Sequence, residues 1–136
     1  MKKGFTLAEL LVTIVILSVL AAIAIPGFSK SRDKAAAAQA VAYLRTLRVG
    51  EKMYYAKNAI YVGCANATAV KTNLGVEVTE ENYKFNVLAP TNSTFFARAR
   101  KGTAPTDCTS TDVICVDQTG NWSGTSTYVN FTKLNS

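Results

Sequence analysis

The residue types on which most enzyme active sites depend are scarce in this sequence. Its 136 residues include no histidine, which excludes Ser-His-Asp and Cys-His nucleophilic sites and removes the commonest side-chain ligand of metal ions. The chemistry that remains is that of nine carboxylates and three cysteines, and no pair of carboxylates falls on an element predicted to hold it rigidly. We therefore expect a chain that is not an enzyme and that binds no cofactor or metal ion.

Three aspartates near the C-terminus come closest to a metal-binding pattern. Asp107, Asp112 and Asp117 could supply oxygen ligands to Ca²⁺, which takes its ligands from loops. Their spacing matches no EF-hand loop. Solvated loop aspartates are therefore the favoured interpretation.

The cysteines bear on cellular compartment and on stability. If the C-terminal part is exported, two of Cys64, Cys108 and Cys115 are expected to pair and the third to be left over. The pair Cys108–Cys115 is favoured because the residues between them can turn back without straining a small sheet, and pairing of Cys64 with either one is the alternative. Lys and Arg flank both ends of the apolar segment described next, so the orientation of the chain rests on the cysteines.

One carboxylate, Glu9, lies inside a long apolar segment from Phe5 to Phe28 that carries no other charge. A charge near the centre of a membrane helix costs about 2.5–3.5 kcal/mol, so it normally has a partner. Cleavage between Gly4 and Phe5 would create a free amine four residues before Glu9. That cation could pair with Glu9 of its own chain or of a neighbouring subunit. The spacing therefore predicts a device that sets the register of assembly, and the alternative is a Glu9 side chain that reaches the membrane surface.

The length of the apolar segment helps to distinguish a membrane helix used in assembly from two other kinds of N-terminal segment. Extended back to Phe5, the uncharged run Leu10–Ile25 approaches the roughly 20 residues that cross a bilayer. An ordinary secretory signal cleaved after Ala24, which would release a soluble binding module, is disfavoured by this length and by Glu9. A generic signal anchor is the other alternative.

The N-terminal motif resembles the class III leader of bacterial type IV pilins and type II secretion pseudopilins. The resemblance covers about the first thirty residues and is carried by Lys2-Lys3-Gly4 followed by Phe5-Thr6-Leu7-Ala8-Glu9-Leu10-Leu11. In that family a prepilin peptidase cuts after the glycine and methylates the new N-terminus. The resemblance implies cleavage after Gly4, methylation of Phe5, an assembly role for Glu9 and a helix bend at Pro26. Ala8 and Gly27 depart mildly from the family pattern.

The resemblance also implies a function, namely polymerisation. The precursor would wait in the inner membrane, surrounded by lipid, with its C-terminal part outside the cytosol. It would then enter an extracellular pilus filament that serves adhesion, motility or DNA uptake. The implied partners are other copies of the chain, the prepilin peptidase and an inner-membrane assembly platform. The alternative is a pseudopilin of a type II secretion or competence machine, although the Asp-Pro-Trp-Gly stretch usual in major pseudopilins is absent. The net charge of +6 is too dispersed to predict a specific nucleic-acid partner.

A long helix is predicted to carry this motif. Pro26 is expected to bend or locally melt it, because proline removes one backbone hydrogen bond and crowds the carbonyl of Ala22. We divide the chain into a leader (1–4), an assembly helix (5–28), an amphipathic continuation (29–62) and a β domain (63–136). In the continuation an apolar stripe of Ala40, Leu44, Leu47 and Tyr54 is flanked by Arg45, Arg48, Glu51 and Lys52.

The C-terminal half is predicted to form a small antiparallel sheet, giving an α+β fold. Residues 63–82 have the composition of a connecting loop. Alternating apolar residues predict strands at 83–87, 94–100 and 113–116, with 128–131 as a candidate last strand. Packed on the amphipathic half of the helix, the sheet would bury Tyr83, Phe85, Val87, Phe95 or Phe96, and Ile114.

Overall fold

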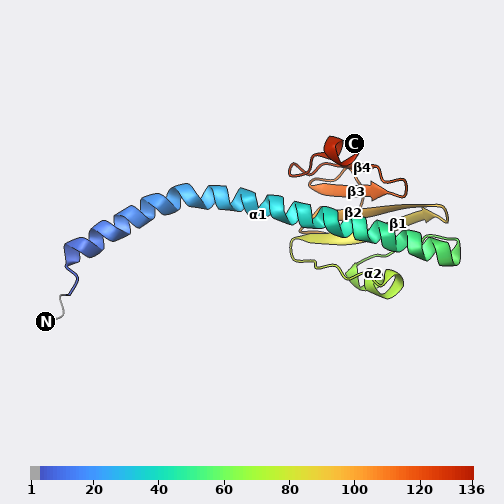
Figure 1. Ribbon diagram of the computed structural model, residues 1–136, viewed down its shortest axis with the longest axis horizontal. Helices are drawn as coiled ribbons and strands as arrows, with labels where there is room; N and C mark the ends of the chain where they lie inside the picture. The colour runs from blue at the N-terminus through green and yellow to red at the C-terminus, as the bar shows by residue number, and fades with distance from the viewer. Residues whose placement is uncertain (1–3) are drawn as a thin grey trace. The chain divides into compact units, whose positions relative to one another are not determined.

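The computed structural model describes residues 4–136, apart from the side chains of Pro26 and Pro90. The helices are α1 (Leu7–Asn58), α2 (Ala67–Leu74) and α3 (Phe131–Leu134), and the strands are β1 (Tyr83–Thr91), β2 (Thr94–Lys101), β3 (Val113–Asp117) and β4 (Trp122–Gly124) (Figure 1). The chain divides into two compact units, Met1–Asp33 and Lys34–Ser136.

The helix α1 contains 52 residues and ends at Asn58 rather than at the predicted position 62. Strong helix formers, including the run Ala35–Ala38, favour its formation. It ends because Ala59 has a φ of 58°, in the left-handed region that cannot continue a right-handed helix. The side-chain amide of Asn58 also donates to the carbonyl of Tyr54, at 3.0 Å, in the last turn.

α1 passes through Pro26 without a break in helical structure. The local melting that we considered for residues 21–26 does not occur in the structure. Proline removes a single backbone hydrogen bond, and the bonds of the residues on either side are enough to keep the chain helical. A bend at Pro26 stays a prediction.

The sheet is four-stranded and antiparallel, with the order β1-β2-β3-β4. β1 and β2 form a hairpin in which Phe85 lies opposite Ala99 and Val87 opposite Ala97. β2 continues the pattern against β3, where Ala99 lies opposite Ile114. Because side chains alternate between the two faces of a strand, these residues gather on one face.

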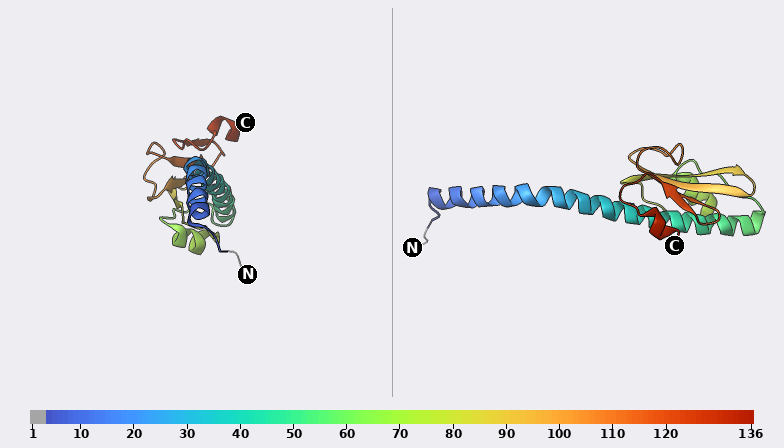
Figure 2. Two further views of the ribbon diagram at one scale, coloured as in Figure 1. Left: turned by 90° about the vertical axis from the view of Figure 1, so that its left-hand side faces the viewer. Right: turned by 90° about the horizontal axis from the view of Figure 1, so that it is seen from above.

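The core lies between this face and the second half of α1 (Figures 1 and 2). The predicted stripe supplies Ala40, Leu44 and Leu47, each at most 1 % exposed. The sheet supplies Tyr83, Phe85, Val87, Phe95 and Ile114, all buried. The alternation of β2 places Phe95 inside and leaves Phe96 37 % exposed. The α+β prediction is thereby confirmed.

The helix α2 was not predicted, because residues 63–82 have the composition of a loop. Two caps explain why a helix forms there. The Asn66 side chain accepts a hydrogen bond from the backbone N–H of Ala69 at 2.9 Å. Gly75, with a φ of 67°, ends the helix in the left-handed conformation. Val70, fully buried, fixes α2 to the core.

The prediction of a last strand at residues 128–131 was wrong. The fourth strand is the shorter β4, and Asn130 begins α3 by accepting a hydrogen bond from the N–H of Lys133 at 3.1 Å. An asparagine cap competes with strand formation because its side chain satisfies the free N–H groups of a helix start. Tyr128, Val129 and Phe131 still pack against the core.

The disulfide joins Cys108 to Cys115, the pairing that the sequence favoured. Cys64 is free and fully buried. Its backbone pairs with Val87 through two hydrogen bonds of 2.9 and 2.7 Å, which brings the segment before α2 onto the edge of the sheet. Burial raises the pKa of its thiol to about 11.

Two of the three C-terminal aspartates, Asp107 and Asp117, stabilise turns by accepting hydrogen bonds. Asp107 accepts hydrogen bonds from the hydroxyl of Ser110 and from the N–H groups of Thr109 and Ser110, which keep the pKa of its carboxyl well below the usual range. Asp117 accepts bonds from the N–H groups of the next turn at 2.8–2.9 Å. Among the described residues, no three His, Cys, Asp or Glu side chains come together as a metal site would require.

Glu51, predicted to flank the apolar stripe, is fully buried instead. It follows Leu44 and Leu47 by seven and four residues, so it lies on their face of α1. One carboxylate oxygen accepts a hydrogen bond from the N–H of Val62 at 3.1 Å, and the other is buried with no partner among the described residues. Burial raises the pKa of Glu51 from 4.5 to about 7.

This raised pKa makes domain stability depend on pH. The folded state holds the Glu51 proton more tightly than the unfolded state. The contribution of this proton to the free energy of unfolding is therefore complete below about pH 4.5 and is lost as the pH rises to about 7. We expect a loss on the order of 1–3 kcal/mol in the free energy of unfolding across this range. Urea titrations of the full chain in detergent, followed by the fluorescence of the single tryptophan, Trp122, measure it.

The matched variants are Glu51→Gln and Glu81→Gln. Glutamine keeps an acceptor for the Val62 N–H but cannot ionise, so Glu51→Gln should flatten the pH dependence. Glu81 is exposed, so Glu81→Gln should show the same pH dependence of stability as the unmodified chain. Equal pH profiles for all three proteins would show that the Glu51 carboxyl is not the group that titrates.

Candidate functional site

The candidate site is the start of α1, where Thr6 and Glu9 form reciprocal hydrogen bonds. The Thr6 hydroxyl oxygen accepts from the N–H of Glu9 at 3.2 Å. One Glu9 carboxylate oxygen accepts from the N–H of Thr6 at 2.8 Å and from its hydroxyl at 2.7 Å. The pattern Thr-x-x-Glu is a capping box, which satisfies N–H groups that have no partner inside a helix.

The capping box directs the Glu9 carboxylate back toward the beginning of the chain. Gly4 and Phe5 precede the helix, and the Phe5 side chain is 87 % exposed. The predicted cleavage position, the residue expected to be methylated and the glutamate predicted to act in assembly therefore lie within six residues of one another at one helix end. The partial positive charge of that end also favours a carboxylate there.

The part of α1 that follows is apolar on every side. Its large hydrophobic side chains from Leu7 to Phe28 are 52–82 % exposed. One window of 18 residues in α1 has a mean hydropathy of 2.7, enough in length and composition to cross a membrane. A helix that is apolar all round requires lipid or other protein around it.

Sequence reasoning singled out Glu9 but missed the role of Thr6. The signal was present, because a Thr three residues before a Glu and directly before an apolar run marks a helix start. The other predicted residues lie apart from this pair along the chain. Pro26 lies within α1, and Cys108 and Cys115 belong to the unit Lys34–Ser136.

The apolar helix with this start, followed by a small α+β unit, defines the class of pilin-like proteins. Residues 1–25 match the family model of the prokaryotic N-terminal methylation motif. No solved structure gives a significant match.

Three characterised relatives specify the class further. The chain is 33 % identical over 93 residues to the type IV wide pilus major component PilA4 of Thermus thermophilus, covering 68 % of this chain and 69 % of that protein. It is 36 % identical over 64 residues to the type IV major pilin protein PilA of Myxococcus xanthus, covering 47 % and 29 %. It is 30 % identical over 88 residues to the type IV major pilin protein PilE of Neisseria gonorrhoeae, covering 60 % and 53 %.

The chain belongs to the type IV pilin family. All three relatives are named as pilus subunits and none as an enzyme, and the pseudopilin alternative is not favoured.

The capping box gives a prediction that does not depend on assembly. Thr6→Val removes the hydroxyl that accepts from the Glu9 N–H, at a cost of about 1 kcal/mol to the first turn. Amide hydrogen exchange at Glu9, measured by NMR on the full chain in detergent micelles, should accelerate about fivefold.

Thr13→Val is the matched control. The Thr13 hydroxyl donates to the carbonyl of Leu10, inside the helix, so its loss leaves the N–H groups of the first turn unchanged. Similar exchange at Glu9 in the two variants would mean that the Thr6 hydroxyl does not hold the helix start.

Proposed function

We propose that the chain is a structural subunit that polymerises into a type IV pilus filament. In this proposal residues 5–28 hold the precursor in the inner membrane, the chain is cut between Gly4 and Phe5, and the mature subunit enters the filament. The observation that carries the proposal is the continuous apolar surface of α1 after Glu9. Family membership and the methylation motif also support the proposal that the chain is a pilus subunit.

The energetics indicate why a charge pair is needed. Apolar side chains that leave lipid for a protein filament gain little from the hydrophobic effect, because lipid tails are as apolar as the filament interior. Close packing holds the helices together, but similar aliphatic side chains along α1 do not select one register. A charge that must be neutralised at a single position does select one.

Glu9 and the Phe5 amine supply that selection. The Thr6–Glu9 capping box partly satisfies the carboxylate in the membrane-bound subunit. After cleavage, the Phe5 amine of one subunit pairs with Glu9 of a neighbour, which removes two unpaired charges from an apolar environment. A subunit displaced along the filament axis would leave both charges unpaired.

The proposed partners follow from this route. The prepilin peptidase cuts after Gly4 and methylates Phe5, and an inner-membrane platform adds the subunit to the filament. The unit Lys34–Ser136 forms the filament surface, where adhesion, motility or DNA uptake takes place.

The first test is the mass of the N-terminal peptide from filaments sheared off cells. The proposal predicts a peptide that begins at N-methylated Phe5 in the sheared fraction. A soluble mature chain beginning at Ile25 would contradict it. The methylated peptide in membranes, with none in sheared material, would instead favour a pseudopilin.

The role of Glu9 is tested by Glu9→Gln against Glu81→Gln. Glu9→Gln should reduce sheared filaments at least tenfold, the factor that corresponds to about 1.4 kcal/mol, while the subunit accumulates in the membrane. Glu81 lies on the exposed connection between α2 and β1, and its substitution should leave filament yield unchanged. Normal filaments from Glu9→Gln would exclude a charge pair as the register device.

A further inference from the structure

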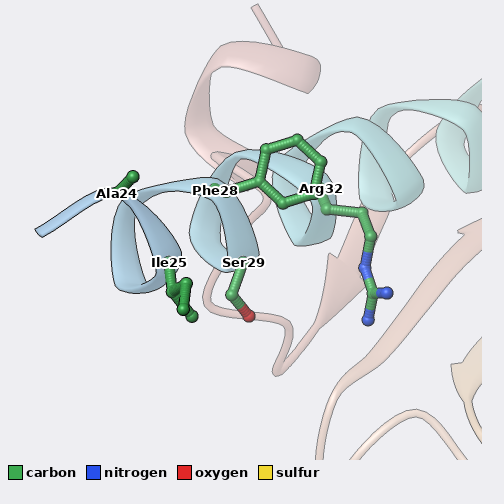
Figure 3. Close-up of a pocket in the computed structure, with 5 residues that line it drawn as sticks. All are labelled: Ala24, Ile25, Phe28, Ser29 and Arg32. Atoms are coloured by element: carbon green, nitrogen blue, oxygen red, sulfur yellow. The ribbon is translucent and has the colours of Figure 1, made fainter. Parts of the chain in front are cut away.

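A shallow groove lies on α1 where its apolar part ends. Its lining residues, drawn in Figure 3, are Ala24, Ile25, Phe28, Ser29 and Arg32. Ala24, Phe28 and Arg32 follow one another at intervals of four residues, so they share one face of the helix. The groove is therefore apolar toward the N-terminus and cationic toward the C-terminus.

The groove coincides with the expected edge of the membrane. The 22 helical residues from Leu7 to Phe28 span about 33 Å, slightly more than the roughly 30 Å of the hydrocarbon core. Phe28, which is 74 % exposed, then lies at the boundary. Arg32 lies one turn, or about 6 Å, beyond it, at the depth of the lipid phosphates.

The charge at this depth is positive. Lys30, Arg32 and Lys34 lie within five residues of each other, with Asp33 as the single carboxylate among them, so the segment carries a charge of +2 (three cations minus one anion). Only Arg32 lines the groove, because Lys30 and Lys34 lie on the opposite side of the helix. The planar guanidinium of arginine binds phosphate through two parallel hydrogen bonds.

Ser29 adds a polar group that is available to a ligand. The hydroxyls of Thr13, Ser18 and Ser31 each donate to a carbonyl of their own helix, at 2.7, 2.7 and 3.1 Å. Within residues 4–136, no hydrogen bond engages the Ser29 hydroxyl. Ser29 and Arg32 are three residues apart and both line the groove, so a single phosphate can reach both.

We propose that this groove binds an anionic phospholipid while the subunit is in the membrane. The phosphate is held by Arg32 and Ser29, and an acyl chain lies against Ile25 and Phe28. The inference rests on the proposed function in one respect, the residence of the subunit in a bilayer before assembly. Lipid fits better than a free anion because the cationic end is continuous with an apolar surface.

The experiment is native mass spectrometry of the full chain, released from micelles that contain equimolar phosphatidylglycerol and phosphatidylcholine. The unmodified chain should retain phosphatidylglycerol over phosphatidylcholine by about fivefold, the effect of roughly 1 kcal/mol per cation at a membrane surface. Arg32→Gln should abolish this preference, and Ser29→Ala should weaken it.

Lys30→Gln is the matched control, since it removes the same charge from the opposite side of the helix, about 3 Å from Arg32 along the helix axis. It should keep most of the preference. An equal loss of the phosphatidylglycerol preference in Lys30→Gln and Arg32→Gln would overturn the site. It would leave only a general attraction of the basic segment for anionic lipid. Full displacement of the lipid by inorganic phosphate, or a lipid-free dimer as the main species, would overturn it in favour of a free anion or a second copy.

This test is independent of the filament. Sheared filaments with N-methylated Phe5, together with no lipid preference in the micelle experiment, would reject the lipid site and retain the proposed function. A lipid preference without filaments would retain the lipid site and reject the proposed function.

Discussion

The structure depends on one constraint, which is that the first half of α1 cannot be left in water. The helix satisfies its own backbone groups, but its side chains are apolar on every side, and among residues 4–33 nothing covers them. A lipid bilayer and a bundle of identical helices both meet this requirement. The second half of the same helix is amphipathic, and it buries one face, which includes Ala40, Leu44 and Leu47, against a sheet from its own chain.

Two glutamates on α1 show how the chain treats charge in apolar surroundings. Glu9 lies at the helix start, where Thr6 provides two hydrogen bonds and the helix end favours negative charge. Glu51 lies in the core with a single backbone donor, from Val62, and takes up a proton near neutral pH. The first arrangement keeps a carboxylate available to a partner, whereas the second removes it from electrostatic interaction.

How much could be predicted from the sequence depended on whether the physical signal was periodic or local. The helical spacing of Leu44 and Leu47, and the alternation in β1 and β2, predicted the α+β core because many residues contribute to each pattern. The features that were missed depend on one or two capping residues: α2 on Asn66 and Gly75, α3 on Asn130, and the start of α1 on Thr6. Glu51 was misplaced because its type predicts exposure, although its spacing placed it on the buried face.

The buried thiol of Cys64 bears on how the folded chain keeps its disulfide pairing. Disulfide exchange requires an exposed thiolate, and a buried thiol with a pKa of about 11 supplies almost none. Cys115 is fully buried as well, so its bond to Cys108 is shielded from an attacking thiolate. In the folded chain, the hydrophobic core therefore keeps the third thiol from exchanging with the disulfide.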